Sequence, residues 1–560
     1  MSTLRILIVG GYGTFGERLV QLMEEEPRLT LLVAGRSLER ARACCARHAH
    51  AAATLVPTTF ERAQEDPQPL AALAVDLVVD ASGPFQAYGA QRYRLIEHCL
   101  ALRLPYLDLA DGSQFVAGVE RFDAAARDAG VFVLSGMSSF PMLTAAVARR
   151  LGSDFARVHS IRGGIAPSPY ARVGDNVIRA IASYAGQIVP IRREGRVVSA
   201  RALLDSHYRV IAVPGHIPLA RRRFSLIDVP DLTVLPRAWP QADVWMGAAP
   251  VPPLLHALLS ACAALVRLGV LRSVSFLAGL MRFVTSHLRW GEDRGGMFVT
   301  LVGEGSDGRP LRREWHLLAD GDDGPLIPSM AVAAVVRKLL DGQAPAPGAR
   351  PALADVSLED YEALFARRRI VSGIRSRVGE RRLPLYQRLL GPAWDALAPQ
   401  IRALHTVTSA ATFSGRCSVV RGRGPLAWLA ATAMGFPHAG ADQPITVWLS
   451  REGDGERWVR TSGRRSFASR QYPGRGRSRW LVRERFGVVS VDMALVVEGA
   501  NLRYVLRRWA LFGVALPLAL GPRSRAVESV EDGQFHFDVE VRLPLAGLVV
   551  HYQGRLSPAK

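Results

Sequence analysis

The chain has 560 residues, a hydrophobic content of 49% and a formal net charge of +20. Its length predicts several domains, and its composition is that of a folded globular protein, which excludes an extended disordered chain. Nearly all of the positive charge is arginine scattered along the sequence, which argues against a concentrated nucleic-acid-binding surface. We therefore expect no nucleic-acid partner.

The cysteines and histidines show none of the common ligand spacings. The five cysteines include no CxxC pair, and no HxxxH or HExxH pattern occurs. These observations indicate a reducing compartment, exclude a disulfide framework and predict no metal site. The first strand begins almost at the N-terminus, which leaves no room for a signal peptide, so the expected location is the cytoplasm.

The opening segment has the order strand, glycine-rich turn, helix and strand that begins a dinucleotide-binding domain. Within GGYGTFG, Gly11, Gly13 and Gly16 stand in GxGxxG register. Gly11 permits the tight turn, Gly13 leaves room for a pyrophosphate, and Gly16 lets the helix pack on the strand. The amides of Thr14, Phe15 and Gly16 are expected to point at the phosphates. The alternative is a purely structural turn.

The end of the second strand indicates which dinucleotide is bound. An NAD enzyme usually has an acidic residue here, whereas this chain has Gly35, Arg36 and Ser37. Arg36 can bind a 2′-phosphate with its guanidinium fork, and Ser37 can donate a hydrogen bond to it. The sequence therefore predicts NADP in preference to NAD. A solvated loop arginine is the alternative for Arg36.

Three later strands of the first domain each end in polar residues. The residues at or just beyond these ends are Ser82, Gly83, Pro84, Asp108, Asp111, Ser138 and Ser139. Because the carboxyl ends of parallel strands meet at one edge of a sheet, we expect these side chains to converge on one ligand crevice. Helix capping is the alternative for each of the aspartates and for Ser138 and Ser139.

Together these motifs resemble the saccharopine dehydrogenase-like family, including its reductase-type branch. The matching stretches, in order, are GGYGTFG, AGRS, ASGPF, YLDLADG and SGMSSFP, and later segments up to about residue 345 resemble the family's second domain. The resemblance implies an NADP-binding Rossmann domain with a second domain inserted before its final elements. It also implies cofactor contacts at Gly11, Gly13, Thr14, Phe15, Gly16, Arg36, Ser82, Gly83 and Pro84. The family's known enzymes act on amino acids joined through a secondary amine.

The middle of the chain leaves the substrate open. Arg162, Arg172 and Arg179 are candidates for binding a dicarboxylic amino acid, but the neighbouring apolar segments are unusual for such a site. Residues 254–284 predict a helical pair that is buried, lines a hydrophobic pocket or lies on a membrane surface, with Arg267 and Arg272 near lipid headgroups. Residues 509–521, which follow Arg507 and Arg508, have the same basic-then-apolar order.

A segment rich in Ala, Pro and Gly, residues 343–354, predicts a linker, and residues 357–370 predict a connecting helix. From about Leu383 the pattern changes to strands. One hairpin is expected to turn at Gly453-Asp454-Gly455 and another near Pro544 and Gly547. This part resembles an uncharacterised domain fused to saccharopine dehydrogenase-like proteins, and we expect no separate chemistry in it.

The predicted fold is α/β: an N-terminal Rossmann domain with an inserted α+β domain, followed by a mostly antiparallel β domain. The predicted domains are residues 1–140 (Rossmann), 141–345 (second domain), 346–382 (linker and connecting helix) and 383–560 (C-terminal). The predicted function is an NAD(P)-dependent oxidoreductase that transfers hydride at a C–N or C–O centre of a small-molecule substrate, which is hydrophobic in one alternative. Asp111 and Tyr184 are the candidates for handling the accompanying proton. A non-catalytic nucleotide-binding scaffold, a peripheral membrane or lipid-binding protein, and a homodimer stay open as alternatives.

Overall fold

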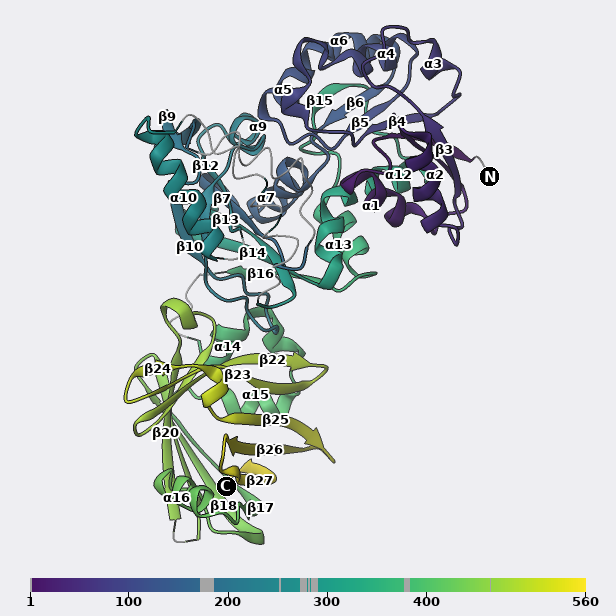
Figure 1. Ribbon diagram of the computed structural model, residues 1–560. Coiled ribbons are helices and arrows are strands. Elements are labelled where there is room, and N and C mark those ends of the chain that lie inside the picture. Colours follow the sequence, from purple (N-terminus) through teal and green to yellow (C-terminus); the bar gives the residue numbers. More distant parts are fainter. Residues whose placement is uncertain are drawn as a thin grey trace. The chain divides into compact units, whose positions relative to one another are not determined.

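The computed structural model describes residues 3–171, 186–250, 253–271, 279, 283, 291–376, 383–463 and 465–559 (Figure 1). Internal contacts divide the chain into two compact units. The first unit comprises Met1–Arg209 and Arg222–Ser372, and the second comprises Val210–Arg221 and Gly373–Lys560. A short piece of the middle of the sequence therefore folds with the C-terminal unit, where the amide of Val497 donates to the carbonyl of Gly215 over 3.0 Å.

A seven-stranded parallel sheet forms the Rossmann domain of the first unit. Its strands are β1 (Leu4–Val9), β2 (Leu29–Gly35), β3 (Thr54–Thr59), β4 (Leu77–Asp80), β5 (Tyr106–Asp108), β6 (Phe132–Ser135) and β15 (Gly348–Pro351). Their order is β15-β6-β5-β4-β1-β2-β3, so the chain runs outward in opposite directions from the junction of β1 and β4. Ile6, Leu7 and Ile8 of β1 are completely buried, as expected for a parallel sheet covered on both faces. Ligands bind at such a junction in doubly wound sheets.

Helices cover this sheet. They are α1 (Thr14–Met23), α2 (Leu38–Arg47), α3 (Gln68–Ala71), α4 (Arg94–Ala101), α5 (Ser113–Gly118), α6 (Asp123–Ala129) and α12 (Ile327–Leu340). The helix α7 (Thr144–Gly152), which follows β6, packs instead against β7 (Phe155–Ala166) and β13 (Arg294–Gly305) of the inserted domain. A 3₁₀ turn at Val119–Phe122 separates α5 from α6. The hydroxyl of Ser329 on α12 donates to the carbonyl of Phe15 on α1 over 3.1 Å, which fixes α12 beside the helix that begins at the glycine turn.

The expected insertion of a second domain into the Rossmann domain is confirmed by β15. The chain leaves the first sheet after β6 and returns with Gly348–Pro351, which pairs in parallel with Phe132–Ser135 (Figure 1). The prediction of a linker over residues 343–354 is therefore corrected, since part of this segment is a sheet strand. Its composition of Ala, Pro and Gly gave no strand signal, and its conformation comes from the pairing with β6.

The inserted domain contains a second seven-stranded sheet in the order β10-β11-β12-β7-β13-β14-β16. Its strands are β7 (Phe155–Ala166), β10 (Ser206–Arg209), β11 (Arg222–Leu226), β12 (Asp243–Ala248), β13 (Arg294–Gly305), β14 (Pro310–Asp320) and β16 (Ile370–Ser376). A separate hairpin, β8 (Ile188–Arg193) and β9 (Arg196–Arg201), and the helices α9 (Asp231–Ala238), α10 (Pro253–Arg267) and α13 (Leu358–Phe365) complete it. The predicted connecting helix corresponds to α13. Ser357 and Asp360 form a capping box at its start, and the chain is already in β16 at Ile370.

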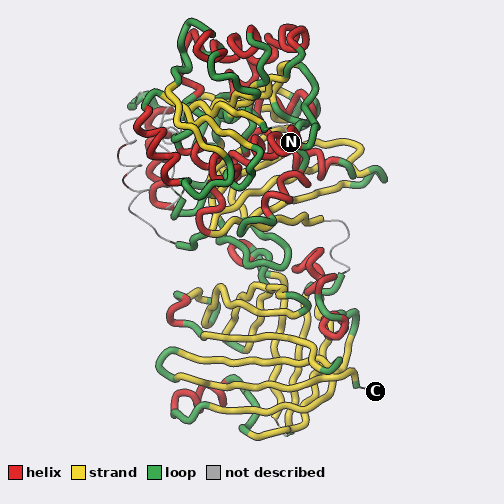
Figure 2. The backbone as a smooth tube through the Cα atoms, turned by 90° about the vertical axis from the view of Figure 1, so that its right-hand side faces the viewer, coloured by secondary structure: helices red, strands yellow, loops and turns green. Residues whose placement is uncertain are grey.

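The second unit is a closed antiparallel sheet (Figure 2). Its strands are β17 (Ala410–Arg421), β18 (Gly440–Glu452), β19 (Gly455–Ser462), β20 (Arg465–Pro473), β21 (Val482–Phe486), β22 (Val489–Glu498), β23 (Asn501–Leu511), β24 (Val514–Leu516), β25 (Arg523–Glu531), β26 (Gln534–Leu543) and β27 (Gly547–Pro558). Each strand pairs with the next one along the chain, except that β25 pairs directly with β23 rather than with β24, and β27 pairs back onto β17 to close the ring.

Three helices accompany the closed sheet: α14 (Leu385–Leu390), α15 (Pro399–His405) and α16 (Pro425–Ala433). The two predicted hairpins are confirmed, with Gly453 and Asp454 between β18 and β19, and residues 544–546 between β26 and β27. The strands begin later than expected, because α14 and α15 occupy the region after Leu383. The predicted fold class, α/β followed by antiparallel β, is confirmed.

Candidate dinucleotide site

The glycine turn after β1 has the tight backbone that the motif requires. Gly10 has a φ of +77°, and the amides of Gly10 and Gly11 donate to the carbonyl of Ala34 over 2.8 and 2.9 Å. A Cβ atom on Gly16 would collide with the carbonyl oxygen of Gly10 and lie 2.7 Å from the Cα of Gly11. Only glycine at this position therefore lets α1 pack so closely on the turn.

The N-terminus of α1 is open to a ligand. Gly13 is the N-cap, and no side chain caps the helix. The amides of Thr14, Phe15 and Gly16 belong to the first turn, where no acceptor inside the helix is available to them. A Cβ on Gly13 would lie 3.0 Å from the carbonyl oxygen of Gly10, and apart from its two chain neighbours Gly10 is the only residue that it would meet within 4 Å in the described part of the chain. This arrangement is suited to a phosphate group.

The turn after β4 lies directly against the glycine turn. A Cβ on Gly10 would lie 2.6 Å from the Cα of Ser82, so the two turns are in contact. The amide and the hydroxyl of Ser82 donate to Oδ1 of Asp80 over 3.0 and 2.5 Å, which fixes the start of the Ser82-Gly83-Pro84 turn. The structure thus brings these three predicted residues to the same sheet edge as the glycines.

A buried polar network lies behind this second turn. It is not among the predictions made from the sequence. The Nε of Arg62 donates to Oδ2 of Asp80 over 2.7 Å, and its guanidinium lies 3.7 Å from the ring centroid of Tyr88. The hydroxyl of Tyr88 lies 2.7 Å from that of Ser82, and burial raises the pKa of Tyr88. Asp80 stands at the end of an apolar strand, and a carboxylate in that position could have indicated a buried polar network. Arg62, in the loop after β3, had no local signal.

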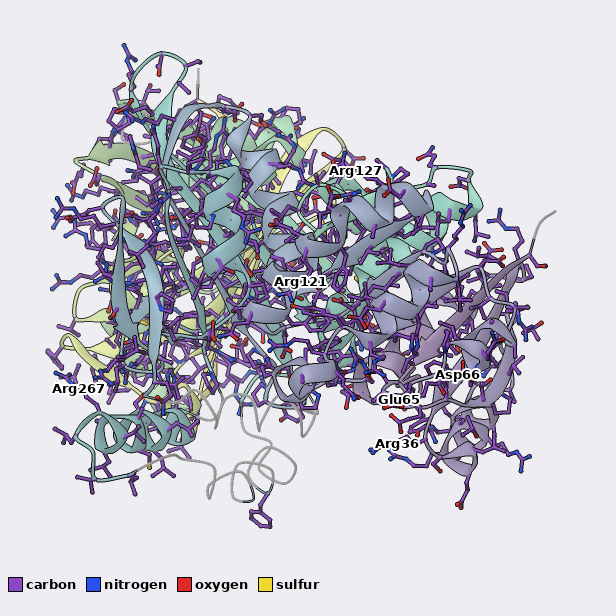
Figure 3. The ribbon with its side chains drawn as sticks, turned by 90° about the horizontal axis from the view of Figure 1, so that it is seen from above. Arg36, Glu65, Asp66, Arg121, Arg127 and Arg267 are labelled. Carbon is purple, nitrogen blue, oxygen red and sulfur yellow. The ribbon has the colours of Figure 1, made fainter. Side chains whose placement is uncertain are left out.

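At the end of β2, Gly35 and Ser37 lie against the side chain of Tyr12. Arg36 is exposed (Figure 3). The amide of Ser37 donates to the hydroxyl of Tyr12 over 3.0 Å, and its side chain accepts from the amide of Arg40 over 3.3 Å. The guanidinium of Arg40 lies 4.7 Å from the ring centroid of Tyr12. Two arginines and the N-terminus of α2 are therefore grouped at the place predicted for the 2′-phosphate.

The two aspartates after β5 have different environments. Asp108 is completely buried, and its Oδ1 accepts from the amides of Ala110 and Gly136 and from the hydroxyl of Ser135 over 2.8–3.0 Å. Burial raises the pKa of Asp108 to about 7. These contacts join the residues that follow β5 to those at the end of β6, and neither Ala110 nor Gly136 lies in a helix.

Asp111, in contrast, lies where the Rossmann domain meets the inserted domain. Its Oδ1 accepts from the side-chain amide of Gln86 over 3.0 Å, and burial raises its pKa. Next to it, the hydroxyl of Ser113 donates to Oδ1 of Asp228 on the loop before α9 over 2.7 Å. Asp228 was not recognised in the sequence. Tyr184, the other candidate for the proton, lies outside the described residues.

Of the three arginines proposed to bind a dicarboxylic substrate, the structure describes Arg162. Arg162 lines a pocket of about 30 Å³ together with His207, Asp243 and Trp245. Arg172 and Arg179 lie outside the described residues. No grouping of the three arginines is therefore established.

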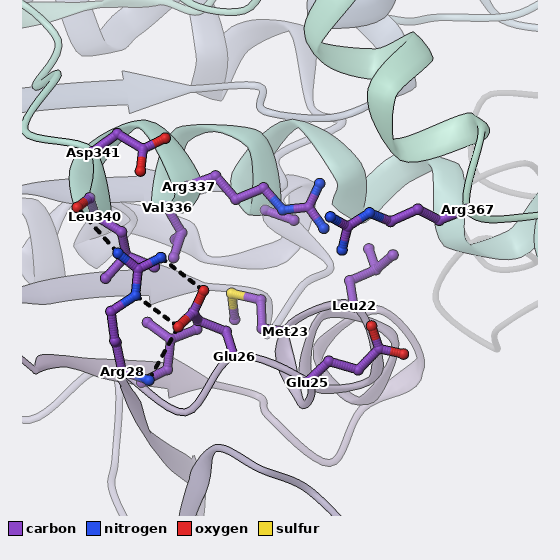
Figure 4. A pocket seen from close by; sticks show the side chains of 12 residues that line it. Leu22, Met23, Glu25, Glu26, Arg28, Val336, Arg337, Leu340, Asp341 and Arg367 are labelled. Carbon is purple, nitrogen blue, oxygen red and sulfur yellow. Dashed lines mark hydrogen bonds and ion pairs between the residues drawn. The ribbon is translucent and has the colours of Figure 1, made fainter.

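A larger pocket, of about 230 Å³, lies between the C-terminal ends of α1 and α12 (Figure 4). Arg28 crosses it, donating to both carboxylate oxygens of Glu26 over 2.8 Å, and this contact lowers the pKa of Glu26 to about 2. Because the pocket is lined by Leu22 and Met23, it lies at the opposite end of α1 from Gly13. It is not the predicted cofactor crevice.

The apolar middle segment is partly exposed. On α10, Leu259, Cys262 and Ala263 are buried, whereas Leu265 and the following Leu268 are 39% and 71% exposed. The rest of the predicted helical pair lies largely outside the described residues. Among the helices that are described, none is long and apolar enough to span a membrane.

Comparison with known proteins gives one family match. Residues 397–556 match the family model "Domain of unknown function (DUF4166)". The sequence-based expectation of an uncharacterised C-terminal domain is thereby confirmed. None of the curated proteins matches the chain.

Several solved structures are similar to about two-thirds of the chain. Saccharopine dehydrogenase (L-Glu forming) from Saccharomyces cerevisiae is 13% identical over 67% of this chain and 100% of its own, with a TM-score of 0.47. GenD2 from gentamicin A biosynthesis, in complex with NAD, is 15% identical over 67% and 97%, with a TM-score of 0.32. The WlbA dehydrogenase from Thermus thermophilus, in complex with NAD and α-ketoglutarate, is 14% identical over 65% and 95%, with a TM-score of 0.28.

Proposed function

We propose that this protein is an NADP-dependent oxidoreductase that transfers hydride at a C–N or C–O centre of a small-molecule substrate. The observation that carries the proposal is the open N-terminus of α1, with Gly13 as an uncapped N-cap beside the Ser82 turn. An uncapped helix start at the junction of a doubly wound sheet supplies backbone donors and a favourable dipole for a pyrophosphate.

Three turns of the chain would each contact a different part of the cofactor. The amides of Thr14, Phe15 and Gly16 would bind the pyrophosphate. Arg36 and Ser37, with Arg40 beside them, would bind the 2′-phosphate, which selects NADP over NAD. The Ser82-Gly83-Pro84 turn, supported by the buried pair of Arg62 and Asp80, would form the wall of the crevice.

The nicotinamide, when bound, would supply or accept the hydride. The chain must then hold or release the proton that accompanies hydride transfer. Asp111 is suited to this role because it lies between the two domains, and burial raises its pKa above that of an ordinary aspartate. Tyr184 stays the second candidate.

The test begins with fluorescence titration of the full chain with NADPH and NADH. The proposal expects tighter binding of NADPH, followed by turnover with a compound from a panel of imines, ketones and secondary amines. Equal affinities would contradict NADP selection. Tight NADPH binding without oxidation in any of these classes would favour the nucleotide-binding scaffold.

A second candidate function is contact with a membrane surface, and the exposure of α10 favours it. Leu268 and Val270 are 71% and 67% exposed directly after Arg267. Apolar side chains next to a basic residue suit the boundary between headgroups and acyl chains. This function is compatible with the oxidoreductase and would place it near a hydrophobic substrate.

A further inference from the structure

Three residues on the outer helices of the Rossmann domain bring different ligand atoms together. Glu17 lies in the first turn of α1, Cys44 lies on α2, and His48 is the C-cap of α2. A carboxylate oxygen of Glu17, the Sγ of Cys44 and a ring nitrogen of His48 all lie within 4.8 Å of one another. The Nε2 of His48 is 3.7 Å from Oε1 of Glu17.

A fourth residue orients the histidine. The Nδ1 of His48 donates to Oε2 of Glu24, near the end of α1, over 2.6 Å. When the Nδ1 of a histidine carries the proton, the lone pair is on Nε2, which here is the atom on the Glu17 side. A carboxylate behind the imidazole is the usual outer partner of a metal-binding histidine, because it fixes the tautomer and strengthens the ligand.

Burial and competing contacts distinguish this cluster from a set of surface acids. Cys44 is completely buried, and burial raises the pKa of its thiol to about 11, which argues against a nucleophilic role. Arg47 binds Oε1 of Glu17 with its Nε over 2.8 Å, but its side chain is 53% exposed. It can therefore move away from this oxygen when an ion binds there.

We propose that Glu17, Cys44 and His48 bind a zinc(II) ion, with water as the fourth ligand. Thiolate, imidazole and carboxylate are all zinc ligands, and bonds of about 2.0–2.3 Å place neighbouring ligand atoms roughly 3.3–3.6 Å apart. The 3.7 Å between Nε2 of His48 and Oε1 of Glu17 is already close to this spacing, and the other separations, which are at most 4.8 Å, would contract by up to about 1.5 Å. The ion would tie α1 to α2, whose N-termini carry the proposed phosphate sites.

The patterns CxxC, HxxxH and HExxH do not include this cluster. Cys44 on α2 and the C-cap His48 are four positions apart, and the third ligand comes from another helix. Residues four apart on a helix lie on one face, so Cys-x-x-x-His is a valid half-site.

The test measures zinc binding to the full chain by competition with a chromophoric chelator, without any nucleotide. We expect one zinc ion per chain and at least about a tenfold loss of affinity in Cys44→Ser and in His48→Gln. Cobalt(II) should give a thiolate-to-cobalt charge-transfer absorption in the wild type and not in Cys44→Ser. Cys45→Ser is the matched control, since this neighbour is outside the cluster, and it should bind as the wild type does. Absence of stoichiometric zinc binding, or loss of it in Cys45→Ser but not in Cys44→Ser, would overturn the proposal.

A substitution of Arg47 should change the zinc affinity in the opposite direction, toward tighter binding. Because it competes for Glu17, Arg47→Gln should bind zinc more tightly than the wild type, while circular dichroism shows an unchanged fold. An unchanged or weaker affinity in this variant would contradict the assignment of Glu17 as a ligand. None of these readouts requires NADPH, so the zinc site and the proposed oxidoreductase function can fail independently.

Discussion

Arg62 and Asp80 form a buried ion pair, with 2.7 Å between Nε and Oδ2, immediately before the turn that contacts the glycine motif. Oδ1 of the same carboxylate accepts from both the amide and the hydroxyl of Ser82. The shape of the Ser82-Gly83-Pro84 turn therefore depends on a completely buried carboxylate that is paired with Arg62.

Replacing that arginine should destabilise the Rossmann domain. Arg62→Leu leaves the Asp80 carboxylate uncompensated, which typically costs about 3–5 kcal/mol of the free energy of unfolding. Arg127→Leu is the matched control, because its pair with Asp123 on α6 is exposed and such pairs contribute about 1 kcal/mol or less. Thermal unfolding of the full chain compares the two variants. Equal melting temperatures for both would contradict the importance of the buried pair.

Gly13 and Gly16 should respond differently to the same substitution. Gly13→Val places its side chain on the open side of the turn, so the protein should fold but lose at least about tenfold in NADPH affinity, or roughly 1.4 kcal/mol. Gly16→Val forces a collision with Gly10 and Gly11 and should unfold the domain. Nucleotide titration and circular dichroism measure the two effects. Unchanged NADPH binding in a folded Gly13→Val variant would mean that the motif is only a turn.

Arg36 should determine the choice of cofactor. Arg36→Asp places a negative charge where a 2′-phosphate would bind, so the preference for NADPH should be lost or reversed in titrations with both nucleotides. Arg42→Asp, an exposed arginine further along α2, makes the same change in net charge and should keep the preference. If both variants changed the NADPH affinity equally, the effect would come from net charge rather than from a contact.

The sequence predicted the glycine turn well because each glycine has a local reason for its place, visible within seven residues of chain. It predicted the C-terminal hairpins for the same reason, since turn residues and alternating strands are local signals. The strand β15, the partner Arg62 and the cluster of Glu17, Cys44 and His48 depend instead on contacts between distant segments. Local sequence patterns do not indicate which distant segments come into contact.

Asp108 should make the stability of the protein depend on pH. Its pKa is about 7 in the folded protein against an ordinary value of 3.8, so the folded state holds this proton more tightly than the unfolded chain does. The resulting stabilisation is complete below about pH 4 and is lost as the pH rises through about 7. Asp108→Asn keeps a carbonyl acceptor for Ala110 and Gly136 but cannot ionise. Its melting temperature relative to the wild type should therefore rise between pH 4 and pH 7. A constant difference across that range would contradict the buried titration.

The exposed apolar residues after α10 should bind the protein to anionic membranes. Leu268 and Val270 follow Arg267, so the leucine and valine can enter the acyl boundary while the arginine stays among the headgroups. In flotation with anionic liposomes, the wild type should rise with the vesicles, and Leu268→Glu with Val270→Glu should leave the protein in the soluble fraction. Val197→Glu is the matched control, because Val197 on β9 is 72% exposed but outside this segment. Because all three positions are exposed, the substitutions should leave the melting temperature unchanged. If the wild type does not float, or if the Val197 variant loses flotation as well, the exposed end of α10 is not a membrane contact.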